Sequence, residues 1–154
     1  MTRKPLLWLT MLLLCLVGTA LAEQTAWRSP LQVEGTTAID VPTAAKLHAE
    51  GIPFVDVRNP RLFKRKHIPG AHHLDLKDGY SREALAQIVA PEQPLVLYCS
   101  GAKCSRSSKA ATLAVSWGYK KIYYFREGVV GWKLAGLPMK FADGSVRPVD
   151  QSGQ

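Results

Sequence analysis

This sequence has only three cysteines, no internal repeat and no low-complexity block. Its length allows one domain whose hydrophobic core does not depend on disulfide bonds. No run of lysine and arginine is interleaved with aromatic residues, so the sequence gives no support to nucleic-acid binding. The formal net charge of +8 instead favours small anionic substrates or acidic partners.

The N-terminus lacks the roughly 20 apolar residues that a transmembrane helix needs. An apolar run from Pro5 to Val17 follows a short basic start and precedes an Ala-x-Ala pattern that ends at Ala22. This order is typical of a cleaved signal peptide. We therefore expect residues 1–22 to be removed and the chain to be exported, to the periplasm or to the medium, with no stable membrane insertion. An uncleaved membrane anchor is the alternative.

Segments with the patterns of strands and helices alternate along residues 37–138. We expect strands at 36–40, 52–57, 72–76, 95–98 and 122–125. We expect helices between Asp40 and Gly51, over 61–66, from Ser81 to before Pro91, over 105–117 and over 129–135. This alternation predicts an α/β fold with a parallel sheet flanked by helices on both faces. Residues 23–36 are expected to lead into the domain, and residues 139–154 to form a polar tail.

The strand at 95–98 ends immediately before Cys99. The carboxyl ends of parallel strands are where α/β proteins bind ligands. The loop that follows, which we call the Cys99 loop (residues 99–106), continues with Ser100, Gly101, Ala102, Lys103, Cys104, Ser105 and Arg106. Small residues let successive backbone N–H groups point into one cradle, and the following helix adds its positive end. Such surroundings lower the pKa of a thiol from about 8.5 to roughly 3.5–7.5. We therefore expect Cys99 to be a reactive thiolate, and a buried inert cysteine is the alternative.

Several segments of residues 37–138 resemble the rhodanese domain, and they occur in the family's order. They are Asp56-Val57-Arg58, His67-Ile68-Pro69-Gly70-Ala71, Tyr98-Cys99, Gly128-Val129-Val130-Gly131-Trp132 and Ala135-Gly136-Leu137-Pro138. The resemblance implies a rhodanese-like fold and a sulfurtransferase that needs no cofactor.

The resemblance also implies a mechanism. The Cys99 thiolate would take sulfur from thiosulfate or another sulfane donor and keep it as a persulfide, before passing it to cyanide, a thiol or a protein acceptor. Loop N–H groups would hold the persulfide. Lys103 and Arg106 would attract the anionic donor.

Three further polar residues are expected to support the site. Asp56 and Arg58 flank a strand end, where we expect an ion pair or a loop brace. His67 is expected to hold its turn by a hydrogen bond. We do not expect a metal site, because His72 and His73 would point to opposite faces of one strand.

The loop departs from the common rhodanese pattern. Arg106 follows Cys99 by seven residues instead of five, and Cys104 intervenes. The family's phosphatase-type loops have five residues between cysteine and arginine, whereas six separate them here. This departure puts the identity of the donor in doubt and gives little support to phosphatase chemistry.

Two other functions stay open from the sequence. The fold can serve as a non-catalytic binding or sulfur-carrier module, or Cys99 and Cys104 can form a thiol redox pair. If the loop N–H groups converge on Cys99, the side chain of Cys104 must point away, near the outer rim of the loop. We therefore expect two free thiols at rest, with a reversible Cys99–Cys104 disulfide as the alternative.

Overall fold

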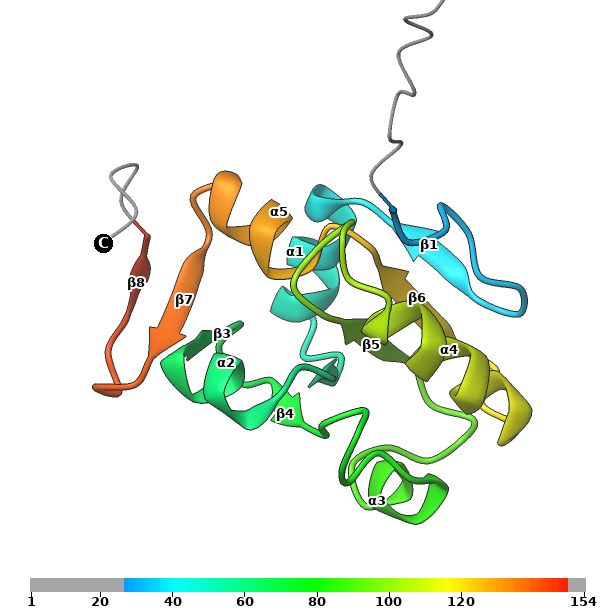
Figure 1. Ribbon diagram of the computed structural model, residues 1–154. Helices are drawn as coiled ribbons and strands as arrows, with labels where there is room; N and C mark the ends of the chain where they lie inside the picture. The colour runs from blue at the N-terminus through cyan, green and yellow to red at the C-terminus, as the bar shows by residue number, and fades with distance from the viewer. Residues whose placement is uncertain (1–26, 150–154) are drawn as a thin grey trace, which may run out of the picture.

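A computed structural model describes residues 27–149 (Figure 1). The predicted signal peptide at residues 1–22 lies outside them. The elements of the described part are, in chain order, β1 (Thr37–Ile39), α1 (Val41–Ala49), β2 (Phe54–Asp56), α2 (Pro60–Arg65), β3 (Lys66–His67), β4 (His72–His73), α3 (Arg82–Ala86), β5 (Leu95–Tyr98), α4 (Arg106–Ser116), β6 (Ile122–Phe125), α5 (Gly128–Leu134), β7 (Pro138–Phe141) and β8 (Val146–Pro148). No helix within residues 27–149 is long and apolar enough to span a membrane.

The central sheet has the strand order β1-β6-β5-β2-β4, and all of its strand pairs are parallel. The inner strands β5 and β2 are buried along their whole length, which explains why both read as apolar runs. Val55 and Leu97 pack in one hydrophobic cluster with α3 and α4, whereas Phe54 and Val96 pack in a second with α1 and α5. Helices therefore cover both faces, and the predicted α/β fold is confirmed.

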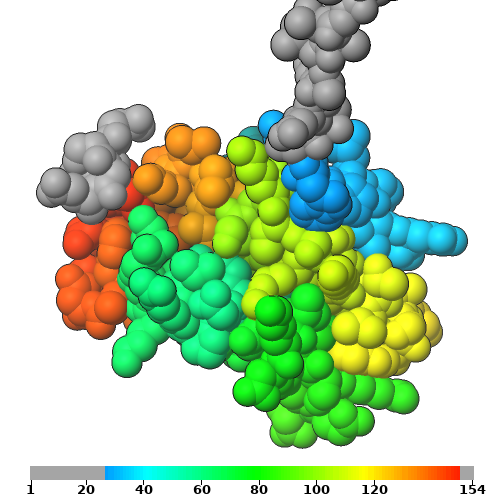
Figure 2. All heavy atoms as spheres, viewed as in Figure 1, coloured from blue at the N-terminus to red at the C-terminus, as the bar shows by residue number. Residues whose placement is uncertain are grey.

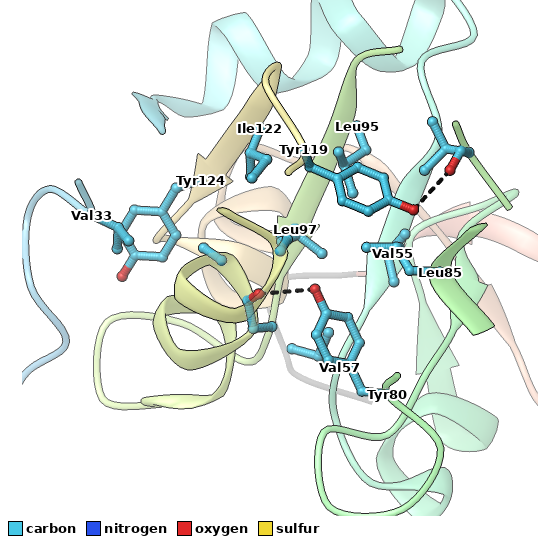
Figure 3. Packing of buried hydrophobic residues seen from close by; sticks show 14 of the residues in the cluster. Val33, Val55, Val57, Tyr80, Leu85, Leu95, Leu97, Tyr119, Ile122 and Tyr124 are labelled. Carbon is cyan, nitrogen blue, oxygen red and sulfur yellow. Dashed lines mark hydrogen bonds between the residues drawn. The ribbon is translucent and has the colours of Figure 1, made fainter. Parts of the chain in front are cut away.

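Two buried tyrosines fix the layer that carries α4 (Figure 3). The Tyr80 hydroxyl donates a hydrogen bond of 2.9 Å to the carbonyl of Ala110 in α4, and the Tyr119 hydroxyl donates one of 3.0 Å to the carbonyl of Val89. Each phenol thus buries an apolar ring and satisfies its polar end. These bonds tie α4, and the segment that follows it, to the segments on either side of α3.

Two helices begin at the residues that the sequence indicated as their starts. The Asp40 side chain accepts a hydrogen bond from the Thr43 N–H at the start of α1, and Ser81 accepts one from Ala84 at the start of α3. The strand predicted at 72–76 is shorter, because only His72 and His73 pair regularly with β2 before the chain turns.

The segment predicted to be a polar tail is ordered from residue 138 to 148. Strands β7 and β8 form a hairpin that pairs antiparallel with β3, at the flank of the molecule beside α2 (Figures 1 and 2). Met139 is fully buried, and the Arg147 guanidinium lies 3.9 Å from the centroid of the Phe141 ring. The sequence did not indicate this hairpin, because β7 is short and Met139 is its only buried residue.

Candidate active site

The Cys99 loop sits at the carboxyl end of β5, against the first turn of α5. The Val129 and Val130 N–H groups donate hydrogen bonds of 3.1 and 2.9 Å to the carbonyls of Cys99 and Ser100. Gly128 makes this close approach possible, because a Cβ atom at that position would lie 2.1 Å from the Cys99 carbonyl oxygen. Its φ of +49° is also a conformation that favours glycine. The loop is therefore held by backbone contacts at its base.

The Cys99 thiol is fully buried beneath the loop. Its sulfur lies 3.1 Å from the Ser107 hydroxyl and donates a hydrogen bond of 3.4 Å to the Cys104 carbonyl. The neighbouring Cys104 thiol and burial raise the pKa of Cys99. This direction is opposite to the one that the sequence predicted, because a carbonyl acceptor and a second thiol face the sulfur.

Cys104 is half-buried, and its thiol interacts with that of Cys99. A turn closed by the Cys104 N–H and the Gly101 carbonyl, 2.8 Å apart, folds the loop back over Cys99. The Cys104 carbonyl faces the Cys99 sulfur, and Cys104 also lines the pocket on the outer side of the loop, which is where its side chain was expected. Both cysteines are free thiols in the structure.

The pKa of Cys104 shifts in the direction opposite to that of Cys99. Hydrogen bonding with the Cys99 thiol lowers the pKa of Cys104 to about 6, against the opposing effect of burial. The backbone N–H groups of Arg106 and Ser100 and the charge of Arg106 act in the same direction as Cys99. A backbone N–H group also acts on Cys99, because that of Ser107 lowers the pKa of Cys99 against the larger causes that raise it.

A pocket of about 590 Å³ opens over the loop. It is lined by Arg28, Ser100, Gly101, Ala102, Lys103, Cys104, Ser105, Arg106 and Val130. The seven loop residues predicted to contact the substrate therefore all reach this pocket, whereas Cys99 is not part of its lining.

Lys103 and Arg106 are placed differently from one another at the pocket. Arg106 forms an ion pair with Asp75 and donates a hydrogen bond of 3.2 Å to the Val57 carbonyl. The ion pair partly neutralises the charge of Arg106, and the two contacts together hold the end of the loop in place. The partial burial of Asp75 opposes ionisation, but hydrogen bonds from the Lys77 N–H and Arg106 lower its pKa overall. Lys103 is exposed and has no ion-pair partner within residues 27–149.

The lead-in contributes to the pocket, which sequence reasoning missed. The Ser29 N–H and hydroxyl donate hydrogen bonds of 2.8 and 3.1 Å to the Ala102 carbonyl, and the Ser29 carbonyl accepts one of 3.0 Å from Arg126. In Figure 2 the surface of the loop lies between this blue segment and the orange α5. Exposed Arg28 is thereby brought to the pocket as a second cation beside Lys103. Nothing in the mixed composition of residues 23–36 signalled this contact.

The predicted supporting residues lie outside the pocket lining. Asp56 and Arg58 form a buried ion pair, with an Nη2–Oδ2 distance of 2.6 Å, and Arg58 also donates a hydrogen bond to the Lys66 carbonyl. His67 Nδ1 lies 2.9 Å from the Phe63 carbonyl oxygen, and the two rings stack with centroids 3.9 Å apart. The structure thus contains an ion pair at the end of β2, and the His67 ring is held by the backbone of α2.

The histidines of the described part of the chain do not form a metal site with their neighbours. Residues 27–149 contain no group of three or more histidine, cysteine, aspartate or glutamate side chains that could hold a metal ion. His73 is instead engaged by the backbone, with Nε2 2.8 Å from the Arg58 carbonyl oxygen. The pocket itself is lined by the half-buried Cys104 together with the cations Lys103 and Arg28.

Comparisons with known proteins agree with this geometry. Among curated proteins, the chain is 32% identical over 102 residues to thiosulfate sulfurtransferase GlpE of Pseudomonas fluorescens, which covers 66% of this chain and 88% of that protein. It is also 32% identical over 88 residues to the HTH-type transcriptional regulator Rv0324 of Mycobacterium tuberculosis, covering 57% of this chain but only 37% of the regulator. The solution structure of a polysulfide-sulfur transferase homodimer from Wolinella succinogenes matches with a TM-score of 0.57 and 27% identity, over 68% of this chain and 78% of that one.

The family model for the rhodanese-like domain matches residues 42–135, which is more than half of the chain. This range begins inside α1 and ends just after α5, so it contains β2, β5 and β6 of the central sheet together with the whole Cys99 loop. The chain therefore belongs to the rhodanese-like domain family.

Proposed function

We propose that this protein is a sulfurtransferase that moves sulfane sulfur from thiosulfate or a similar anion to a thiol or cyanide, through a cysteine persulfide in the Cys99 loop. A role in sulfur transfer is supported by the family and by relatives named thiosulfate sulfurtransferase. The observation that carries the proposal is the cysteine loop at the carboxyl end of β5, beneath a pocket that Lys103 and Arg28 border. The persulfide is assigned to Cys99, the residue that follows β5.

The proposed reaction has two displacement steps. A loop thiolate attacks the outer sulfur of thiosulfate, the bond between the two sulfur atoms of the donor breaks, and sulfite leaves with the electron pair. The enzyme keeps the outer sulfur as a persulfide. An acceptor thiolate or cyanide then attacks that sulfur, and the cysteine thiolate leaves unchanged.

The pocket is suited to small anions of this kind. Its exposed cations attract a negative donor, and its volume of about 590 Å³ leaves room for a donor longer than thiosulfate. A structural relative is named a polysulfide-sulfur transferase. Polysulfide anions, which carry the same sulfane sulfur, are therefore a second class of donor to test.

The Cys99 sulfur lies 3.4 Å from the Cys104 carbonyl oxygen, and this closeness of two free cysteines favours a second candidate function, that of a thiol redox protein. In that case Cys99 and Cys104 would form a disulfide and would transfer two electrons instead of a sulfur atom. The two functions differ in mass: sulfur transfer adds one sulfur atom to the protein, whereas oxidation removes two hydrogen atoms.

Intact-mass spectrometry of the reduced protein after incubation with thiosulfate or polysulfide tests the proposal. We expect a gain of one sulfur atom, the release of sulfite from thiosulfate, and loss of the added mass when cyanide is supplied. The matched control is the double variant Cys99→Ser/Cys104→Ser, which should gain nothing. If the wild-type protein gains no sulfur from either donor, the proposed function is wrong. A loss of two hydrogen atoms without added sulfur would favour the redox function.

We also propose that the mature protein is exported. The proposal rests on the basic, apolar and Ala-x-Ala pattern of residues 1–22. Protein recovered from the periplasmic fraction or the medium of a bacterial host should begin at Glu23, as measured on its N-terminal peptide. Recovery only of membrane-bound chains that still contain residues 1–22 would support the anchor instead.

A further inference from the structure

The lead-in at residues 28–30 contacts the Cys99 loop, although it precedes the range 42–135 that matches the rhodanese-like domain. Ser29 is only 3% exposed, and it donates two hydrogen bonds to the Ala102 carbonyl, of 2.8 Å from its N–H and 3.1 Å from its hydroxyl. We call these two hydrogen bonds the Ser29 clamp. Because both donors of a buried serine meet one carbonyl, the clamp holds that part of the loop in one position.

The lead-in is itself anchored to the end of β6. Arg126 Nε donates a hydrogen bond of 3.0 Å to the Ser29 carbonyl, and the Tyr124 hydroxyl donates one of 3.1 Å to the Pro30 carbonyl. Tyr124 belongs to β6, and Arg126 follows that strand directly. The loop is thus held in two places, at its base by α5 and at Ala102 by a segment that is tied to the central sheet.

The clamp also brings two cations to one pocket. Arg28 directly precedes Ser29 in the chain, Lys103 directly follows Ala102, and both cations line the pocket. Neither takes part in an ion pair with another residue of the described range. Two cations attract a donor with two negative charges more strongly than a donor with one. The pocket therefore has the charge pattern of a site that selects dianions.

We propose that Arg28 is a specificity-determining residue that selects sulfur donors with two negative charges, and that Ser29 is a positioning residue that places Arg28 and Lys103 for this selection. This inference rests on the proposed sulfurtransferase function. Cys99 stays the proposed nucleophile, and no bond of Arg28 or Ser29 forms or breaks in the reaction. Because these residues act on binding of the donor before and during the reaction alike, their loss should raise KM and leave kcat nearly unchanged.

Two donors of the same sulfane sulfur test the selection by charge. Thiosulfate carries two negative charges and methanethiosulfonate carries one, and each is assayed with cyanide as the acceptor by measuring thiocyanate. In Ser29→Ala and in Arg28→Ala we expect KM for thiosulfate to rise about two- to fivefold, and KM for methanethiosulfonate to rise less. The kcat values should stay within about twofold of wild type.

A conservative variant and a matched control accompany this assay. Ser29→Thr keeps the hydroxyl and should restore the wild-type KM. Thr36→Val removes another hydroxyl of the lead-in, which donates a hydrogen bond of 2.7 Å to the Val33 carbonyl and is not part of the clamp, so KM should not change.

The outcomes separate this inference from the proposed function. An unchanged KM for thiosulfate in both Ser29→Ala and Arg28→Ala would overturn the inference, and so would equal increases for the two donors. An increase in Arg28→Ala alone would support the specificity role and overturn the positioning role. If the wild-type protein transfers no sulfur from either donor, the proposed function fails and this inference fails with it.

The clamp has a second readout that does not depend on activity. Lysyl endopeptidase cleaves after lysine and not after Arg28, so cleavage of the native protein at Lys103 measures how often the loop opens. Because Ser29→Ala removes one of the two hydrogen bonds, we expect cleavage at Lys103 to be about two- to tenfold faster. Arg28→Ala and Thr36→Val keep the clamp and should be cleaved at the wild-type rate. Circular dichroism establishes that the variants are folded, and a wild-type rate in Ser29→Ala would overturn the positioning role.

Discussion

The carboxyl ends of β2 and β5 are paired neighbours in the sheet, yet they use their polar residues in opposite ways. At the end of β2, Asp56 and Arg58 are buried and bind each other through several hydrogen bonds of 2.6–3.0 Å. After β5, the chain bends back and leaves the Cys104 thiol at a pocket. We call the end of β2 the closed end, because its polar groups bind each other within the fold. We call the end of β5 the open end, because its loop faces a pocket.

The difference shows how to separate structural from reactive polar groups at one sheet edge. The hydrogen-bonding capacity of Asp56 and Arg58 is used within the fold, so these groups have little left for a ligand. At the Cys99 loop, the exposed Lys103 and Arg28 leave charge available to a ligand. Arg106 links the two ends, because it lines the pocket and also donates a hydrogen bond to the Val57 carbonyl. We therefore assign stability to the end of β2 and reactivity to the end of β5.

The largest effect should come from breaking the closed end. Arg58→Ala leaves the Asp56 carboxylate buried without its partner, and we expect the free energy of unfolding to fall by about 3–5 kcal/mol. Urea denaturation followed by circular dichroism measures this change. The matched control is Lys120→Ala, which removes the exposed pair with Glu92 and should cost at most about 1 kcal/mol. Similar losses in the two variants would contradict the distinction between closed and exposed pairs.

The next largest effect should come from lifting the loop off α5. Gly128→Ala places a Cβ atom against the Cys99 carbonyl, and we expect a loss of about 2–4 kcal/mol together with most of the sulfur transfer. Gly136→Ala is the control, because its φ is also positive, at +71°, but a Cβ there meets nothing within 4 Å. It should cost only the backbone strain of about 1–2 kcal/mol and keep full activity. Equal activity losses would mean that the Gly128 contact does not position the loop.

The fold was predictable from the sequence because local signals and burial agree. The apolar strands β2 and β5 are buried on both faces, and residues such as Asp40 and Ser81 cap the helices that follow them. The hairpin of β7 and β8 was missed, since a strand of four residues with one fully buried side chain resembles a polar segment.

The site was predictable as a loop but not as an arrangement of side chains. Residue order identified the segment from Cys99 to Arg106, whereas the turn between Gly101 and Cys104 decides which sulfur faces the pocket. Asp75 and Arg28 come from distant parts of the chain and were missed for that reason. Their contacts depend on tertiary packing, which no local pattern encodes.

A smaller effect should come from the ion pair that links the two strand ends. Asp75→Asn removes the charge that faces Arg106, and we expect a loss of about 1–3 kcal/mol at neutral pH. The native pKa of Asp75 is lowered, so its ionised form stabilises the fold above the ordinary carboxyl pKa of about 3.9, and this contribution is lost as the pH falls through the native value. The difference between variant and wild type should therefore shrink on acidification. Denaturation curves at a series of pH values measure it, and a constant difference would contradict the ionic role.

The smallest effect should come from the two exposed cations at the open end. Lys103→Ala and Arg28→Ala each remove a charge from the pocket, and an exposed charge contributes about 0.2–1 kcal/mol, so we expect KM for thiosulfate to rise up to about fivefold in each. Their double variant should show both increases combined. Because the Debye length falls from about 10 Å at 0.1 M salt to about 3 Å at 1 M, the increases should fade at high salt. The control is Lys121→Ala, which removes an exposed cation at the amino end of β6, away from the carboxyl ends of the strands where the pocket lies. If Lys103→Ala and Arg28→Ala leave KM unchanged at low salt, attraction of the donor does not depend on these cations, and the open end selects its substrate through the backbone N–H groups of the loop.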